Sequence, residues 1–236
     1  MALPKRDSWV IRNAKRLLTV LRSPRQFKHF PTWLMSFRPG YALATPLPWL
    51  NFDAIDYLKL RAVAGWRVFE YGSGGSTLFW LKCGADVVSV EHDPQWHTIL
   101  QERLVHSPQV DYRLVLPESG DLCERGEEAI SRPDCYRSSN WQYAGMNFRC
   151  YASQIDEFPD QYFDLVIVDG RARPACIMHS IPKIKTDGML VLDNADRPYY
   201  LAHVDSLLAE FELHQFYGMT PGSLDYTQTN IYVKRA

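Results

Sequence analysis

The chain has 236 residues, of which 46% are hydrophobic and 22% charged, a composition typical of a globular protein that buries a full core. It has no run of about 18 consecutive apolar residues, which excludes a typical membrane-spanning helix. The basic first residues lack the apolar core of a secretory signal, so we do not expect one. The five cysteines are odd in number and never form a CxxC pair, so we expect neither a disulfide scaffold nor structural zinc, and a reducing, cytoplasmic location.

The net charge of −1 conceals a basic N-terminus, because residues 1–40 hold nine Lys or Arg and one acid, Asp7. Ser8 is placed to cap a helix that ends near Arg22, with its apolar residues on one face. Two interpretations stay open. The helix packs on the rest of the chain with its charges solvated, or residues 8–22 lie on an anionic membrane and give peripheral contact with its inner face.

Residues 24–48 are rich in proline and aromatic side chains, which indicates a linker that packs on the domain after it. We therefore divide the chain into two parts. Residues 1–47 form a basic helix and linker, and residues 48–236 form the main domain.

Helices and strands alternate from Asn51 onwards, which predicts an α/β fold with a doubly wound, mostly parallel sheet. The expected helices cover 51–62, 76–83, 94–105, 151–157, 174–184 and 199–210. The expected strands cover 67–71, 87–91, 110–116, 163–169, 188–193, 213–219 and 229–234, the last two forming a hairpin. Residues 117–150 are too long for an ordinary connection, which favours a lid or substrate loop.

The strongest motif is a glycine turn between a strand and a helix, from Glu70 to Thr77 (EYGSGGST). Glycines let the backbone approach a ligand closely, and a helix start offers N–H groups to a negative group such as a carboxylate. The dinucleotide fingerprint GxGxxG would need a glycine at Thr77, so that match fails. Glu91 ends the next strand, 21 residues after Glu70, where an acid can accept both hydroxyls of a ribose.

On these residues the chain resembles the class I S-adenosylmethionine-dependent methyltransferases over roughly residues 48–235. The first family motif matches Val68, Phe69, Glu70, Gly72 and Gly74, the ribose-binding acid matches Glu91, and the fourth-strand motif resembles 163–170 (FDLVIVDG). Many members carry a third glycine where this chain has Ser76. The resemblance implies a Rossmann-like, seven-stranded methyltransferase fold with an antiparallel C-terminal strand, and S-adenosyl-L-methionine as cofactor.

The resemblance also implies a binding site. Glu70 and the backbone of 72–74 would hold the amino-acid end of the cofactor, Glu91 its ribose, and His92 would flank the adenine. The candidate cofactor-binding residues are Glu70, Tyr71, Gly72, Ser73, Gly74, Ser76, Thr77, Glu91, His92 and Asp169.

Polar residues follow two further strands, in 169–173 (DGRAR) and 193–197 (DNADR), and should meet at the carboxyl edge of the sheet. The candidate catalytic residues there are Asp169 and Asp193 as proton acceptors and Arg171 for an anionic substrate. Asp169, Asp193 and Asn194 also look like the magnesium ligands of catechol-type O-methyltransferases. The nearby positive charges of Arg171, Arg173 and Arg197 oppose a cation, so we assign no metal ligands. Surface ion pairing of these arginines is the structural alternative.

The predicted function is S-adenosylmethionine-dependent methylation, with O-methylation of a small-molecule or sugar acceptor, including anionic ones. The alternatives are a Rossmann-type nucleotide-binding oxidoreductase and a non-catalytic binding module. A nucleic-acid substrate is disfavoured, because residues 41–236 are acidic overall and DGRA stands where a base-flipping NPPY would be. Oligomeric state is not predicted.

Overall fold

The computed structural model describes residues 24–120, 123 and 126–235, so the helix expected over residues 8–22 lies outside the described residues. A seven-stranded sheet forms its centre. From edge to edge the strands are β3 (Val110–Leu114), β2 (Asp86–Glu91), β1 (Arg67–Tyr71), β6 (Phe163–Val168), β7 (Ile184–Leu192), β9 (Thr227–Lys234) and β8 (Phe211–Gly218). The pairs from β3 to β7 are parallel, and β9 is antiparallel to both β7 and β8, which confirms the predicted fold class.

The central strands β1 and β6 are buried along most of their length, and the mainly apolar sequence of β6 is typical of such a strand. They pair in register, with Val68 opposite Leu165 and Tyr71 opposite Val168. Both strands therefore end at the same edge of the sheet, and the loops that follow them are neighbours.

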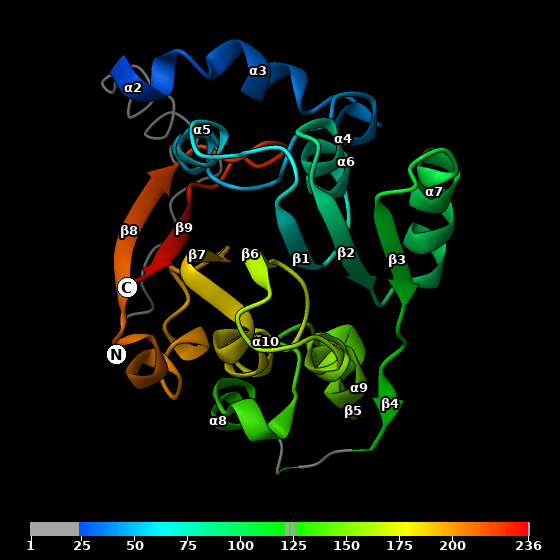
Figure 1. Cartoon of the computed structure of the whole chain (residues 1–236), viewed down its shortest axis with the longest axis vertical. Coiled ribbons are helices and arrows are strands. Elements are labelled where there is room, and N and C mark those ends of the chain that lie inside the picture. Colours follow the sequence, from blue (N-terminus) through cyan, green and yellow to red (C-terminus); the bar gives the residue numbers. More distant parts are fainter. Residues whose placement is uncertain (1–23, 121–122, 124–125, 236) are drawn as a thin grey trace, which may run out of the picture.

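Helices cover both faces of this sheet (Figure 1). On one face lie α5 (Phe52–Lys59) and α6 (Gly75–Lys82), whose buried residues share a core with Val68 and Leu165. On the other face lie α9 (Arg149–Ala152), α8 (Glu127–Ser131) and α10 (Arg173–Ser180), and α9 and α10 pack into a core around Phe69 and Val166. Helix α7 (Pro94–Leu104) packs beside β2 and β3. Each helix that follows a strand starts at the carboxyl edge of the sheet, where the functional loops lie.

The segment that we expected to be a linker contains three short helices, α2 (Pro24–Phe27), α3 (Phe30–Met35) and α4 (Tyr41–Ala44). Side chains fix it to distant parts of the chain. Gln26 Nε2 donates to Asp53 Oδ2 at 2.8 Å, and Gln26 Oε1 accepts from the Met219 amide at 2.9 Å. Helical turns form here because these long-range bonds and the aromatic contacts of Phe30 and Trp33 hold the backbone.

The helix expected over 199–210 is wrong, because this segment forms two separate 3₁₀ helices, η5 (Pro198–Tyr200) and η6 (Asp205–Leu208). Tyr200 is buried, and its hydroxyl contacts the Ser139 hydroxyl at 2.9 Å and accepts from Arg197 Nη1 at 3.1 Å. These side-chain contacts explain why the helical pattern of the sequence does not produce one continuous helix.

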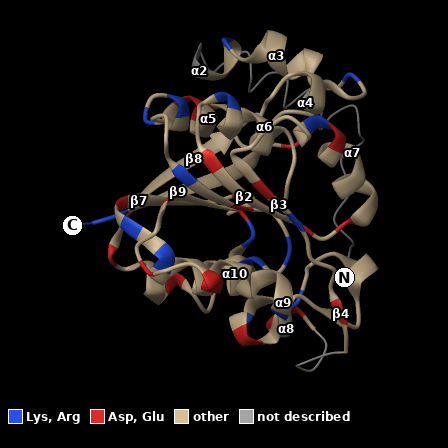
Figure 2. Cartoon of the chain, turned by 45° about the vertical axis from the view of Figure 1, so that its right-hand side comes forward, with Lys and Arg blue, Asp and Glu red and all other residues tan. Residues whose placement is uncertain are grey.

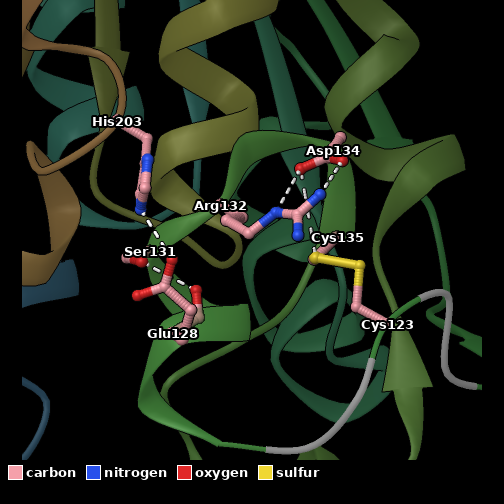
Figure 3. Close-up of a disulfide and its surroundings, with 7 residues drawn as sticks. All are labelled: Cys123, Glu128, Ser131, Arg132, Asp134, Cys135 and His203. Atoms are coloured by element: carbon pink, nitrogen blue, oxygen red, sulfur yellow. Dashed lines mark hydrogen bonds and ion pairs between the residues drawn. A yellow bond between two sulfur atoms is a disulfide. The ribbon is translucent and has the colours of Figure 1, made fainter.

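A disulfide joins Cys123 and Cys135 in the long segment after β3 (Figure 3). This corrects our expectation of no disulfide framework. The 3₁₀ helix η1 (Pro133–Cys135) brings the two cysteines together, with a Cα–Cα distance of 5.4 Å. Beside the bridge, Arg132 donates two hydrogen bonds to Asp134, and His203 from the segment after η5 contacts Glu128 (Figure 3).

The cytoplasmic location stays a prediction, and the disulfide is a feature more common in oxidising compartments.

The described residues of 117–150 also include the short strands β4 (Glu118–Ser119) and β5 (Met146–Asn147), which pair antiparallel, and the 3₁₀ helix η2 (Trp141–Tyr143) between them in sequence. Figure 2 shows Lys and Arg distributed along the ribbon together with Asp and Glu, over helices on both faces of the sheet. None of the helices among those residues combines the length and apolar composition needed to cross a membrane.

Candidate functional site

A cavity of about 400 Å³ opens at the carboxyl edge of the sheet, above the ends of β1, β2 and β6. Three loops supply most of its wall: the glycine turn after β1, the acidic end of β2 and the loop after β6. The lining residues are Trp49, Gly72, Ser73, Gly74, Gly75, Ser76, Glu91, His92, Asp93, Trp96, Asp169, Gly170 and Arg171.

The floor of the cavity requires two glycines in contact. Gly72 has φ +91, and a Cβ on it would lie 2.9 Å from the Gly170 Cα. A Cβ on Gly170 would overlap the Tyr151 hydroxyl. The loops after β1 and β6 therefore pack backbone against backbone, and this opens the space above them.

Glu70 lies beneath the glycine turn and is fully buried. Its Oε2 accepts from Thr77 Oγ1 at 2.5 Å and from Ser89 Oγ at 2.8 Å, while its Oε1 has no hydrogen-bond partner among the described residues. Burial raises the pKa of Glu70 to about 7, although the nearby hydroxyls of Ser76, Thr77 and Ser89 lower it. Thr77 Oγ1 also accepts from the Gly74 amide at 3.0 Å, so Glu70 helps to fix the start of α6.

Glu91 has the opposite environment, although it is also nearly buried. Its Oε1 accepts from the amides of His92 and Asp93, at 2.7 and 2.9 Å. Its Oε2 accepts from the hydroxyl and the amide of Ser73, at 2.7 and 3.2 Å. Burial acts to raise the pKa of Glu91, but the hydrogen bonds and the His92 ring outweigh burial and lower the pKa to about 2. Glu91 is therefore a permanent negative charge in the cavity wall.

His92 and Arg171 close one side of the cavity. Arg171 Nε donates to His92 Nε2 at 2.9 Å, and His92 Nδ1 lies 2.8 Å from Glu91 Oε1. The Arg171 guanidinium lies over the ring of Tyr143, 5.3 Å from its centroid, and that ring is 5.1 Å from the His92 ring. Tyr143, from the segment over 117–150, therefore contacts two residues that line the cavity. This is the position expected of a substrate loop or lid.

Arg173, at the start of α10, lies between the ends of β6 and β7. It is buried, and its Nη2 donates to Asp169 Oδ1 at 3.0 Å while its Nη1 donates to the backbone oxygen of Asp193. Asp193 Oδ1 accepts from Thr229 Oγ1 and its Oδ2 accepts from Asn194 Nδ2, both at 2.8 Å. Burial raises the pKa of Asp169, and the neighbouring Asp193 raises it further, against the effect of Arg173.

These contacts test the magnesium hypothesis. The carboxylate oxygens of Asp193 are both occupied by donors, and the cation beside Asp169 is a guanidinium. A divalent ion bound to Asp169 would lie beside the buried, positively charged Arg173, which would repel it, so the residues do not fit a metal site.

The structure brings together most of the predicted site residues. Those that line the cavity are Gly72, Ser73, Gly74, Ser76, Glu91, His92, Asp169 and Arg171. Glu70 and Thr77 lie behind the turn, and the Tyr71 side chain points into the core, where its hydroxyl donates to the Ala152 carbonyl at 2.6 Å. Asp193 is buried outside the cavity.

Sequence reasoning missed Trp49 and Trp96 as lining residues, and Arg173 as the partner of Asp169. A signal existed for Arg173, because it follows Asp169 by four residues, and for Trp96, because it follows the helix-capping Asp93 by three. No local signal indicated Trp49.

Solved structures that share this architecture include methyltransferases. A proposed O-methyltransferase from Klebsiella pneumoniae matches with a TM-score of 0.55 and 12% identity, over 94% of this chain and 97% of that one. The O-methyltransferase TomG from Streptomyces achromogenes, which takes part in tomaymycin synthesis and was solved in complex with S-adenosylmethionine, matches with a TM-score of 0.53 and 14% identity, over 86% and 89%. No protein-family profile matches the sequence, and a search of curated proteins finds no relative. The chain therefore has the fold of the class I S-adenosylmethionine-dependent methyltransferases.

Proposed function

We propose that the protein is an S-adenosylmethionine-dependent methyltransferase that methylates a hydroxyl of a small-molecule or saccharide acceptor. The observation that carries this proposal is the cavity at the carboxyl edge of the sheet, with the glycine turn on one wall and Glu91 on another. The fold shared with the methyltransferases is independent support.

The charges of the cavity favour a cationic ligand over a dinucleotide. Its lining includes three carboxyl groups, from Glu91, Asp93 and Asp169, and one guanidinium, from Arg171. The sulfonium and ammonium groups of S-adenosylmethionine are positive, whereas the pyrophosphate of a dinucleotide is negative and would be repelled. This disfavours the oxidoreductase alternative.

The residues present fit the parts of that cofactor. Glu91 can accept hydrogen bonds from the ribose hydroxyls if the Ser73 hydroxyl gives up its hydrogen bond to Glu91 Oε2. The first backbone amides of α6 can donate hydrogen bonds to the carboxylate of the cofactor. Glu70 Oε1 lies below the turn without a hydrogen-bond partner among the residues that the structure describes, and it can accept from a nearby donor. When bound, S-adenosylmethionine supplies a methyl group on a positively charged sulfur.

Asp169 is the proton acceptor that this arrangement supports best. Its side chain is 26% exposed and lines the cavity, and Arg173 holds it in place through Oδ1. An acceptor hydroxyl that gains a methyl group loses its proton, and Asp169 takes that proton in the proposed mechanism. Arg171 stays the candidate partner for an anionic group of the acceptor. We do not retain Asp193 in this role, because it lies outside the cavity.

Calorimetric titration with S-adenosylhomocysteine, S-adenosylmethionine and NAD tests the proposal. We expect binding of the first two and none of NAD. Binding of NAD alone would support the oxidoreductase, and binding of none of them would remove the proposal.

A further inference from the structure

A second cavity, of about 330 Å³, adjoins the one described above. We call it the aromatic groove and define it by Phe37, Arg38, Tyr41, Trp49 and Trp96. Trp49 and Trp96 line both cavities, so the two spaces meet at these rings. A ligand in the groove would therefore lie next to the proposed cofactor site.

The groove is built by the α3–α4 segment, which bridges two distant parts of the molecule. At one end Trp33 Nε1 donates to the Ser223 carbonyl, and Ser36 Oγ accepts from the Gly222 amide, both at 2.8 Å. At the other end Arg103 on α7 donates to the Leu43 carbonyl at 3.4 Å. The segment is thus fixed over the carboxyl edge of the sheet, between the β8–β9 loop and α7.

The shared tryptophans are held in place from both sides. Trp96 Nε1 donates to the Ser73 carbonyl at 2.9 Å, which ties the groove to the glycine turn. Trp49 packs against Gly222, where a Cβ would contact its ring at 3.6 Å, yet its side chain keeps 54% of its surface exposed. A flat, exposed indole beside a cavity offers a stacking surface.

The groove also has a defined charge. Among the described residues that line it, Arg38 is the only charged one. Arg38 is exposed, and no hydrogen bond or ion pair of its guanidinium to another described residue is seen, so it is free to bind a carboxylate or phosphate.

The lining is poor in groups that could satisfy a sugar. The hydroxyl of Ser36 is already used, because it donates to the Trp33 carbonyl and accepts from Gly222. Only the Tyr41 hydroxyl and Arg38 remain as side-chain hydrogen-bonding groups apart from the ring N–H of Trp49. A saccharide would bury several hydroxyls without partners, which is costly, whereas an aromatic ring would not.

From this we infer that the aromatic groove binds the methyl acceptor, and that the acceptor is a planar aromatic hydroxy compound with an anionic group that Arg38 recognises. This inference rests on the proposed function and narrows its substrate class. It assigns Trp49 and Trp96 to stacking, and it assigns recognition of the anionic group to Arg38 in place of Arg171, which does not line the groove.

Calorimetry with three probes tests the inference. The probes are 4-hydroxybenzoate, the uncharged 4-hydroxybenzyl alcohol, and glucuronate, which is an anion without an aromatic ring. We expect 4-hydroxybenzoate to bind best of the three. The affinity of the Arg38→Gln variant for 4-hydroxybenzoate should be about tenfold lower than that of the wild type and close to its affinity for the alcohol. The reason is that the carboxylate of the probe loses its charged hydrogen-bond donor. Arg61→Gln is the matched control, because it removes the same charge from an exposed arginine outside the groove, and it should bind like the wild type.

A second pair of variants tests the stacking. Trp49→Ala should weaken 4-hydroxybenzoate about tenfold, whereas Trp141→Ala, which removes an 83% exposed indole far from the groove lining, should not. The inference is overturned if glucuronate binds as well as 4-hydroxybenzoate, if no probe binds at millimolar concentration, or if Arg38→Gln changes nothing.

S-adenosylhomocysteine is titrated into the same samples. Its affinity should be equal in wild type and Arg38→Gln. Failure of this compound to bind would overturn the proposed function, while the probe titrations would still decide whether the groove binds aromatic anions.

Discussion

The carboxyl edge of the sheet has two halves, the ends of β1 and β2 and the ends of β6 and β7, and they stabilise their carboxylates in different ways. At the ends of β1 and β2, Glu91 is stabilised by amides and a hydroxyl from residues close to it along the chain or across the adjacent turn. At the ends of β6 and β7, Asp169 and Asp193 are balanced by one buried cation, Arg173. The first half is suited to hold a ligand through fixed dipoles, and the second half is suited to proton transfer, because its charge can change.

The largest effect that we expect concerns the second half. Asp169→Asn should lower turnover by about 10²- to 10⁴-fold, because the proton acceptor is lost while the side-chain shape is kept. Single-turnover kinetics with any accepted substrate, together with calorimetry, measure this. Affinity for S-adenosylhomocysteine should stay within a few-fold of wild type. If that affinity disappears instead, Asp169 belongs to the cofactor pocket and the division between the two halves is wrong.

Arg173→Met should destabilise the fold by about 3–5 kcal/mol, because the partly buried Asp169 and the buried Asp193 lose their neighbouring cation. Thermal unfolding should show this as a fall in Tm of about 10 °C. Arg197→Met, at a less buried arginine, is the control and should cost much less. Equal effects of the two substitutions would contradict the central role of Arg173.

Glu91→Ala should weaken S-adenosylhomocysteine about 100-fold, since the ribose hydroxyls lose a charged acceptor. Calorimetry measures the loss, and far-UV circular dichroism checks that β2 still forms. Unchanged affinity would show that the first half does not bind a ribose.

The pH dependence of stability should separate Glu70 from Glu91. The pKa of Glu70 is raised to about 7 in the folded protein, so its contribution to stability is complete below about pH 4.5 and is lost as the pH rises towards 7. Urea unfolding should show a loss on the order of 3 kcal/mol in this interval that Glu70→Gln removes. The pKa of Glu91 is lowered to about 2, so its contribution is present above about pH 4.5 and is lost below it. Identical pH curves for wild type and Glu70→Gln would contradict the assignment to Glu70.

A chelator should have the smallest effect of all. Because Arg173 lies where a metal would bind, EDTA should leave turnover unchanged, and added Mg²⁺ should not raise it. Activity lost with EDTA and restored by Mg²⁺ would contradict our interpretation of this half of the edge.

The sequence predicted the first half of the edge well because its signals are local. The strand at 67–71 was predicted with the bounds that the structure shows. Its sequence, RVFEY, is rich in β-branched and aromatic residues and ends directly at a glycine turn. Glu91 and the turn lie together because β1 and β2 are adjacent parallel strands in register, with Glu70 opposite Ser89.

The second half could not be predicted to the same depth. Its Asp169–Arg173 pair is local, but Asp193 is held by Thr229, which lies 36 residues away along the chain. The α3–α4 segment was missed for the same reason, because Trp33 binds Ser223 from 190 residues away. The disulfide between Cys123 and Cys135 was missed for a related reason, because the spacing of cysteines says nothing of the turn at 133–135 that unites them. Hydrophobic periodicity reports which face is buried and carries no information on such pairings.

The contact between Gly72 and Gly170 has a consequence for laboratory evolution of this protein. A side chain at either position would collide with backbone or with Tyr151, so randomised libraries that include these two positions would lose most of their members to misfolding. The exposed residues of the aromatic groove, such as Phe37 and Arg38, make no such backbone contact, and a selection for altered acceptors should begin there.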